Sequence, residues 1–124
     1  MKNPTPKLTD AELEVMRAIW ELEGGTVREV HERLNRNRPL AYTTVMTMLN
    51  ILEEKGHLNR RKQGRAYLYQ PVRPKSQVIS SMVEDFLGKV FDGSARPLVL
   101  SLVKDQKLSE EDLEEIANMI REVE

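Results

Sequence analysis

Four basic side chains gather within six residues near the middle of the chain, and together they have the chemistry of a phosphate-binding surface. Arg60, Arg61, Lys62 and Arg65 surround the dipeptide Gln63-Gly64. A solvated turn needs one or two charges, not four of the same sign. Long cations clustered in this way neutralise nucleic-acid phosphates, so the segment predicts contact with a nucleic-acid backbone.

A second group of residues is uncharged and has the chemistry of base recognition. When the segment Tyr42 to Lys55 is wound as a helix, its apolar residues occupy one face and polar residues the other. Threonine hydroxyls can bond base edges, and threonine and methionine methyls can contact thymine methyls. A solvated face is the alternative, although an exposed methionine among threonines is unusual there. The candidate base contacts are Tyr42, Thr43, Thr44, Met46 and Thr47.

Further phosphate contacts are expected outside the basic cluster. Free N–H groups at the starts of two predicted helices, around Thr26 to Arg28 and Tyr42 to Thr44, suit phosphate oxygens. Tyr67 and Tyr69 share one strand face, where their hydroxyls either reach a phosphate or pack against the helices. The candidate phosphate contacts are Thr26, Arg28, Arg60, Arg61, Lys62, Arg65, Tyr67 and Tyr69.

Three short predicted helices must position these groups. Capping boxes at Thr9–Glu12 and Thr26–Glu29 start the first two helices, which end near Leu22 and Asn35. The third runs from Tyr42 to about Lys55 and stops before a glycine. A turn between the second and third helices is typical of a helix-turn-helix, although a plain three-helix bundle shares this pattern.

The segment after the third helix favours the helix-turn-helix. Two short strands, His57–Lys62 and Arg65–Gln70, flank the turn at Gln63-Gly64, and Pro71 closes the second strand. A basic hairpin directly after a helix-turn-helix is a wing. We therefore predict a mainly α fold with a small β-hairpin, in which residues 1–73 form a winged-helix DNA-binding domain.

Residues 74–124 are predicted to form a helical dimerisation domain. One helix follows Pro74 to about Phe91, a short helix spans Leu98–Val103 with Pro97 at its first position, and a last helix starts at a Ser109–Asp112 capping box. Their apolar stripe is wider than one small domain needs, which indicates a partner surface. The candidate dimerisation residues are Val78, Met82, Phe86, Val90, Leu113, Ile116 and Ile120.

Charge and composition are consistent with a DNA-binding first part of the chain and a dimerising second part. Residues 1–75 carry 14 Lys and Arg against 9 Asp and Glu, whereas residues 76–124 carry 5 against 11. The basic half suits DNA and the acidic half should avoid it, although chance segregation would give the same counts. The absence of cysteine excludes disulfides and thiolate sites and fits a cytoplasmic protein. No apolar run is long enough to cross a bilayer, and no signal peptide is recognisable.

An enzyme is not expected. The two histidines, His31 and His57, have no partner at metal-ligand spacing and are predicted to be surface residues. The chain contains no HExxH motif, glycine-rich phosphate loop or nucleophile elbow. We therefore predict no catalytic residue, no metal and no cofactor.

Four stretches resemble the penicillinase-repressor family of the BlaI/MecI type. They are Leu8–Met16 with the following Trp20, Ala41–Leu49, Glu54–Leu58 and Gly64–Pro71. The resemblance implies a winged-helix N-terminal domain, a helical C-terminal dimerisation domain and operator binding as a homodimer. Family members repress genes for β-lactamases, penicillin-binding proteins or copper handling, so a near-palindromic operator of β-lactam-response or cell-envelope genes is expected. A winged-helix module that binds protein instead of DNA is the alternative.

Two departures from the family pattern concern induction. The copper-responsive branch carries paired CxC motifs, and this chain has no cysteine, so copper sensing is not expected. In the antibiotic-responsive branch a membrane sensor protease system cuts an Asn-Phe bond within the apolar segment. Ser101 and Leu102 stand at the matching position and are the candidate proteolytic site. Ordinary core packing of Leu98–Val103 is the alternative reading of that segment.

Overall fold

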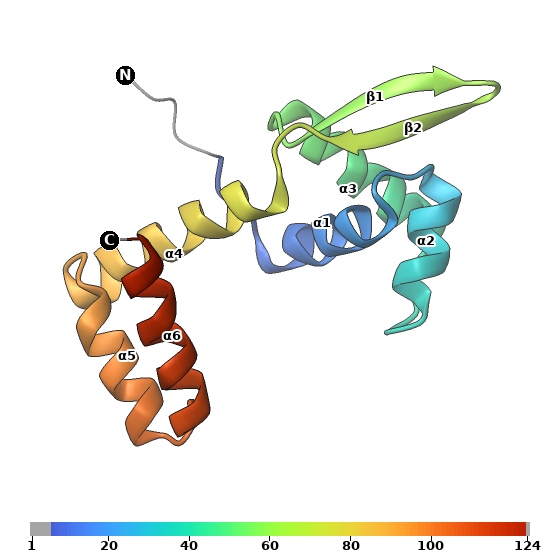
Figure 1. The fold of residues 1–124 in the computed structure, drawn as a ribbon. Coiled ribbons are helices and arrows are strands. Elements are labelled where there is room, and N and C mark those ends of the chain that lie inside the picture. The colour runs from blue at the N-terminus through green and yellow to red at the C-terminus, as the bar shows by residue number, and fades with distance from the viewer. Residues whose placement is uncertain (1–5, 124) are drawn as a thin grey trace. The chain divides into compact units, whose positions relative to one another are not determined.

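The computed structural model describes residues 6–123, within which the chain forms six helices and one two-stranded hairpin (Figure 1). The elements in chain order are α1 (Asp10–Leu22), α2 (Val27–Asn35), α3 (Tyr42–Glu54), β1 (Leu58–Gln63), β2 (Ala66–Pro71), α4 (Lys75–Phe91), α5 (Ala95–Lys104) and α6 (Glu110–Val123). The predicted fold class, mainly α with a small β-hairpin, is confirmed.

The chain divides into two compact units within α4. The first unit ends at Ser81 and the second begins at Met82. The first two turns of α4 therefore belong to the first unit, although the sequence places the start of the dimerisation domain at residue 74. That functional boundary stays a prediction, since compactness alone does not say which residues contact a partner.

Local hydrogen bonds explain where the first two helices begin. The Thr9 hydroxyl accepts from the Glu12 N–H at 3.1 Å, and the Glu12 carboxylate accepts from the Thr9 N–H at 2.8 Å. Thr26 and Glu29 form the same reciprocal pair, at 3.2 and 2.9 Å. These hydrogen bonds confirm both predicted capping boxes. Each box pairs two N–H groups at the start of its helix within four residues, so it forms without a tertiary contact.

The core of the first unit lies between α1, α2, α3 and the base of the hairpin. The predicted inner face of α3 is confirmed: Val45, Leu49 and Leu52 are fully buried, and Met48 packs against them at the edge. The other buried members of the cluster are Val15, Met16, Ala18, Ile19, Val30, Leu34, Leu58 and Tyr69. Because Leu58 and Tyr69 belong to the strands, this core joins the hairpin to the helices.

The hairpin extends away from α1, α2 and α3 (Figure 1). Its pairs run from Leu58 opposite Pro71 to Gln63 opposite Ala66, so the two-residue turn is Gly64-Arg65, one residue later than predicted. Gly64 has a φ of 63°, which a glycine at the first position of a type II′ turn adopts without a steric penalty. Arg65 therefore lies in the turn instead of beginning the second strand.

This register divides the wing cations between two faces. Side chains alternate along a strand, and Arg60 is paired with Tyr69, and Lys62 with Tyr67. These residues share the face that carries the buried Leu58 side chain. Arg61 is paired with Leu68 and lies on the opposite face.

A close backbone contact connects the start of α2 to the hairpin. The N–H of Gly25 donates to the Tyr69 carbonyl and the N–H of Tyr69 donates to the Gly25 carbonyl, both at 2.9 Å. The preceding Gly24 has a φ of 106°, and a Cβ atom there would lie 3.1 Å from the Tyr69 carbonyl oxygen. Glycine is required at residue 24 for both reasons.

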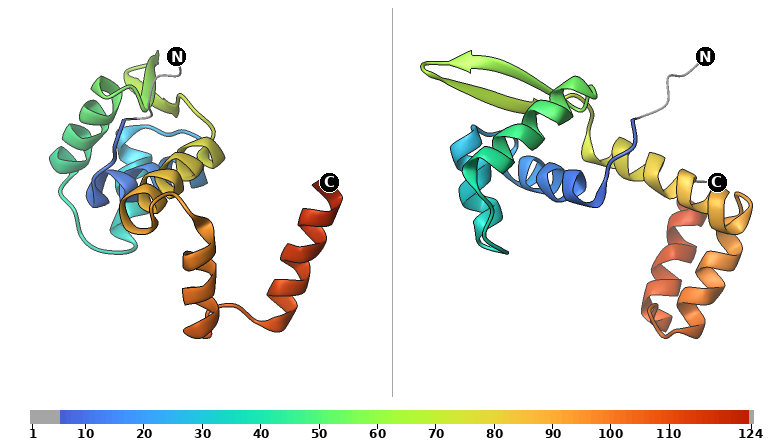
Figure 2. Two further views of the ribbon diagram at one scale, coloured as in Figure 1. Left: turned by 90° about the vertical axis from the view of Figure 1, so that its left-hand side faces the viewer. Right: turned by 180° about the vertical axis from the view of Figure 1, so that it is seen from behind.

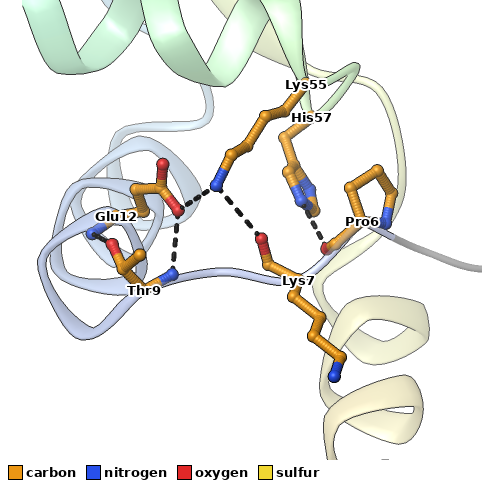
Figure 3. Close-up of polar contacts among 6 residues, drawn as sticks. All are labelled: Pro6, Lys7, Thr9, Glu12, Lys55 and His57. Atoms are coloured by element: carbon orange, nitrogen blue, oxygen red, sulfur yellow. Dashed lines mark hydrogen bonds and ion pairs between the residues drawn. The ribbon is translucent and has the colours of Figure 1, made fainter.

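A buried polar cluster holds the chain before α1 against the junction of α3 and β1 (Figure 3). The His57 Nε2–H donates to the Pro6 carbonyl at 2.8 Å, and the Lys55 ammonium donates to Glu12 at 2.7 Å and to the Lys7 carbonyl at 3.4 Å. His57 is 1% exposed, so its assignment to the surface was wrong. The tertiary fold covers it with a segment fifty-one residues away in sequence.

Burial and hydrogen bonding shift the pKa values of His57 and Glu12 in this cluster. Burial lowers the pKa of His57, and the Pro6 carbonyl opposes this effect only partly, so the ring is neutral near pH 7. Burial favours a raised pKa for Glu12, but hydrogen bonds from Lys55 and Thr9 outweigh it and lower the pKa. With the proton on Nε2, Nδ1 of the neutral ring is an acceptor, and it has no hydrogen-bond partner among the described residues.

The second unit contains the end of α4 together with α5 and α6, which run in opposite directions (Figure 2). The Ser109 hydroxyl and the Asp112 carboxylate form the predicted cap of α6, at 3.0 and 2.9 Å. Helix α5 begins at Ala95, earlier than predicted, and Pro97 is its third residue. Proline is tolerated there because the first-turn N–H groups have no partner within a helix.

No residue between 82 and 123 is buried, although many are apolar. Val78, by contrast, belongs to the first unit and is 1% exposed, so its assignment to the dimer interface was wrong. It is already covered by its own chain and has no surface left for a partner. Within residues 6–123 no helix is both long enough and apolar enough to span a membrane.

Candidate nucleic-acid interface

A groove of about 400 Å³ lies between the start of α2, the exposed side of α3 and the hairpin. It brings together members of the predicted base-contacting and phosphate-contacting sets that are up to 43 residues apart in sequence. Its lining residues are Thr26, Val27, Arg28, Tyr42, Met46, Asn50, Arg60, Arg65, Ala66, Tyr67 and Tyr69. One concave surface therefore offers cations, hydroxyls and an uncharged helix face to a single ligand.

The outer face of α3 is exposed as its periodicity predicts. Thr43, Thr44 and Thr47 are exposed, as are the larger side chains of Tyr42 and Met46. None of these side chains contributes to the core cluster, so all five are available to a ligand. Their contact with bases stays a prediction.

A half-buried histidine supports the start of α3. The His31 Nε2 atom lies 2.7 Å from the Leu40 carbonyl, and its ring meets the Tyr42 ring edge to face at 5.6 Å. This contact orients Tyr42 at the N-terminus of the helix. His31 is therefore partly buried and in contact with Tyr42, whereas its sequence context indicated a surface residue.

The N-termini of α2 and α3 differ in what they offer to an anion. The Thr26 N–H donates to the Glu29 carboxylate at 2.9 Å, so only the hydroxyl proton of Thr26 remains for a phosphate. The N-cap residue of α3 is Ala41, whose side chain makes no capping hydrogen bond. Among the described residues, the N–H groups of Val27 and Arg28 on α2 and of Tyr42, Thr43 and Thr44 on α3 have no side-chain partner, so both helices offer first-turn donors to an anion and α3 offers one more.

Arg28 is held only weakly. Its guanidinium forms an ion pair with Glu32 at 3.2 Å, and both side chains are largely exposed. Exposed pairs of this kind contribute only about 0–1 kcal/mol to stability. Arg28 is thus free to exchange this pair for a phosphate.

The two wing tyrosines have different surroundings. The Tyr69 ring is buried in the core, and its hydroxyl donates to the Asn50 carboxamide oxygen at 2.8 Å. Of the two roles predicted for Tyr69, these contacts favour packing against the helices over contact with a phosphate. Tyr67 is exposed and lines the groove, so its hydroxyl stays a candidate phosphate contact.

The wing cations also differ from one another. Arg60 forms an ion pair with Glu53 of α3 at 3.2 Å, and its guanidinium lies 4.3 Å above the Tyr67 ring. Interaction with the Tyr69 hydroxyl, and then with Glu53, raises the pKa of Arg60. Within residues 6–123, by contrast, Arg61, Lys62 and Arg65 are exposed and have no acidic side chain at ion-pair distance.

The apolar surface of the second unit is the candidate dimer interface. Phe86 and Val90 of α4 are about half exposed, and Met82 and Leu113 are partly buried. On α6 a shallow apolar groove of about 490 Å³ is lined by Ile116, Met119, Ile120 and Val123. Met119 is 60% exposed and follows Ile116 at helical spacing, so it joins the candidate interface residues although the sequence prediction did not include it.

Within the described part of the chain, no group of three His, Asp or Glu side chains is placed to hold a metal ion. The candidate proteolytic bond lies in the C-terminal half of α5, where Ser101 is exposed and Leu102 is partly buried.

Comparison with known proteins places this architecture in a family. Residues 8–122 match the family described as penicillinase repressor. The chain is 33% identical to the penicillinase repressor of Bacillus licheniformis over 117 residues, which are 94% of this chain and 91% of the relative. It is 28% identical to the methicillin resistance regulatory protein MecI of Mammaliicoccus sciuri, with 97% and 98% covered.

Solved structures show the same similarity in three dimensions. The solution structure of the Bacillus licheniformis BlaI monomeric form in complex with the blaP half-operator has a TM-score of 0.52 and 39% identity, covering 61% of this chain and 92% of that one. A MarR family protein from Bacillus stearothermophilus, with a TM-score of 0.55, 16% identity and 94% and 72% covered, shows a likeness of fold alone. The match over residues 8–122, together with these relatives, shows that the chain belongs to the penicillinase repressor family.

Proposed function

We propose that this protein is a transcriptional repressor that binds a near-palindromic operator as a homodimer. The observation that carries the proposal is the groove in which the uncharged face of α3, two helix N-termini and the basic hairpin converge. The structure of BlaI with a half-operator supports DNA as the ligand. The basic hairpin also favours DNA over a protein partner. Attraction to DNA phosphates requires positive charge, whereas binding to a protein partner does not.

The chemistry of the surface divides the roles of its residues. Side chains on the exposed face of α3 read base edges, because hydroxyls and methyl groups recognise A·T pairs without bidentate arginine contacts. This set is Tyr42, Thr43, Thr44, Met46 and Thr47. Phosphates are bound by the hydroxyls and cations around it, which are Thr26, Arg28, Arg61, Lys62, Arg65 and Tyr67.

Dimerisation uses the second unit. Its apolar side chains, including Phe86, Val90, Ile116 and Ile120, have no buried site within their own unit. A second copy covers these faces. The two linked winged-helix units then read half-sites about one helical turn of DNA apart. Once the first winged-helix unit is bound, the linkage raises the effective concentration of the second unit at its half-site.

Fluorescence anisotropy with duplexes from the region upstream of the protein's own gene tests this function. A labelled random-sequence duplex of equal length serves as the control. We expect weak, strongly salt-dependent binding to the random duplex and binding about 10³-fold or more tighter to one upstream segment. Salt-independent or absent binding to every duplex would favour the protein-binding alternative.

We further propose that the regulated genes serve β-lactam response or the cell envelope, and that the protein acts in the cytoplasm without catalysing a reaction. The family membership supports this assignment. Transcript levels in a deletion strain test it: genes next to the repressor gene should rise. Unchanged transcripts of envelope and β-lactam-response genes would refute the assignment while leaving DNA binding intact.

We propose cleavage at Ser101-Leu102 by a membrane sensor protease as the route of release from DNA. No residue of α5 is buried within its own chain, which favours local unfolding of this helix and access of a protease to the bond. Cleavage would separate α4 from α6 and divide the dimer surface. Fragment masses after induction test this: a fragment ending near residue 101 is expected, and derepression with an intact chain would refute it.

A further inference from the structure

Arg60 differs from the other wing cations because its guanidinium already interacts with other side chains of the protein. Its Nε atom lies 3.2 Å from a carboxylate oxygen of Glu53, near the end of α3. Its guanidinium carbon lies 4.3 Å from the centre of the Tyr67 ring, on the neighbouring strand. One side chain of β1 thus contacts both α3 and β2.

These contacts lie where the hairpin leaves the core. Arg60 is paired across the strands with Tyr69, whose buried ring and bond to Asn50 anchor β2 to α3. Beyond this pair, toward Gly64, no residue of the hairpin is buried. The ion pair between Arg60 and Glu53 is therefore the outermost polar attachment of the hairpin to α3 among the described residues.

A phosphate contact by Arg60 would conflict with these surroundings. The Nε edge of the guanidinium faces the Glu53 carboxylate, so a phosphate would have to bind the remaining N–H groups beside an existing negative charge, which repels it. Arg61, Lys62 and Arg65 incur no such cost, because no acidic side chain among the described residues lies at ion-pair distance from them. On electrostatic grounds Arg60 is therefore less suited to bind a phosphate than its three neighbours.

Building on the proposed DNA-binding function, we infer that Arg60 is a positioning residue. Together with Glu53 it fixes the hairpin relative to α3, so that Arg61, Lys62 and Arg65 meet the phosphates while α3 meets the bases. Glu53, an acidic residue on the DNA-reading helix, supports DNA binding through this pair instead of opposing it.

Salt-dependent binding of full-length variants to a labelled random-sequence duplex separates the two roles. The test variants are Arg60→Gln and Glu53→Gln, with Arg61→Gln and Glu54→Gln as charge-matched controls. Losing a phosphate contact reduces the slope of log K against log salt by about 1, and we expect this for Arg61→Gln. For Arg60→Gln we expect the slope to stay unchanged while affinity falls about two- to fivefold, the range of an exposed ion pair.

The effect of Glu53→Gln on DNA affinity has opposite signs for a positioning Arg60 and for a phosphate-binding Arg60. We expect Glu53→Gln to weaken binding relative to Glu54→Gln, and the double variant with Arg60→Gln to bind no more weakly than either single one. A phosphate-binding Arg60 would instead lose a unit of slope on substitution, and Glu53→Gln would tighten binding by removing a competing charge. Either of these results overturns the inference.

Amide hydrogen exchange of residues 58–71 without DNA gives an independent readout. Exchange should be faster in Arg60→Gln and Glu53→Gln than in the wild type, and unchanged in Glu54→Gln. Equal exchange in all variants overturns the positioning role even if the protein binds DNA. Failure of the wild type to bind any duplex would instead refute the proposed function, and the exchange result would still test the hairpin attachment.

Discussion

Ile120→Asp is predicted to dissociate the homodimer while leaving the winged-helix unit folded. Ile120 lies on α6 in the apolar groove that it shares with Ile116 and Met119, and 57% of its surface is exposed in the isolated chain. Aspartate at this position would place a charge in the surface that a second copy covers. The unit containing α1, α2 and α3 ends at Ser81 and does not include this residue.

The expected size of the effect follows from the exposed fraction. Fully burying an isoleucine contributes about 1.5–3 kcal/mol, so covering the exposed 57% of Ile120 contributes about 0.9–1.7 kcal/mol in each protomer. A two-fold dimer loses this contribution twice, about 1.7–3.4 kcal/mol, which corresponds to a roughly 20- to 300-fold rise in the dimer Kd. The cost of burying the new carboxylates adds to this value.

Sedimentation equilibrium over a range of protein concentrations measures the change. Asn118→Asp, on another side of α6 and exposed, is the matched control because it adds the same charge away from the groove. Ile120→Asp should be monomeric at concentrations where this control is dimeric, and should bind a full operator only as weakly as a half-site. An unchanged dimer Kd would show that α6 does not contribute to the interface.

Three further predictions concern the winged-helix unit. Met46→Ala should weaken operator binding by about 1–3 kcal/mol with little change on random DNA, as measured by anisotropy; an equal loss on both would remove Met46 from base recognition. Gly24→Ala should lower the free energy of unfolding in urea by more than about 1 kcal/mol, because Gly24 has a φ of 106° and a Cβ would crowd the Tyr69 carbonyl, whereas Gly88→Ala, which meets open space, should not. Because the folded protein lowers the pKa of His57 below 6.5, unfolding binds a proton, so stability is complete above about pH 6.5 and falls as the pH drops through the folded pKa. His57→Gln keeps an N–H donor for Pro6 and should flatten this decline in thermal unfolding between pH 7.5 and 5.5; an unchanged slope would refute the role of His57.

Local patterns in the sequence determined most of the secondary structure. The capping boxes at Thr9 and Thr26 and the buried face of α3 follow from interactions within a few residues, so they are correct without knowledge of the fold. The same holds for the exposure of the threonines and Met46 on α3. The hairpin was found, but its turn was placed one residue early, because two adjacent dipeptides, Gln63-Gly64 and Gly64-Arg65, satisfy the same local rule.

Only the tertiary structure decided which side chains remain available for a ligand or a partner. His57, Tyr69 and Val78 are each buried by contacts that no local pattern contains: a distant carbonyl for His57, an asparagine on α3 for Tyr69 and the packing of the first unit for Val78. Arg60 is separated from its neighbouring cations in the same way, by Glu53 seven residues earlier and by the strand register. Charge and residue type are properties of the chain, whereas burial and pairing depend on which segments fold against one another.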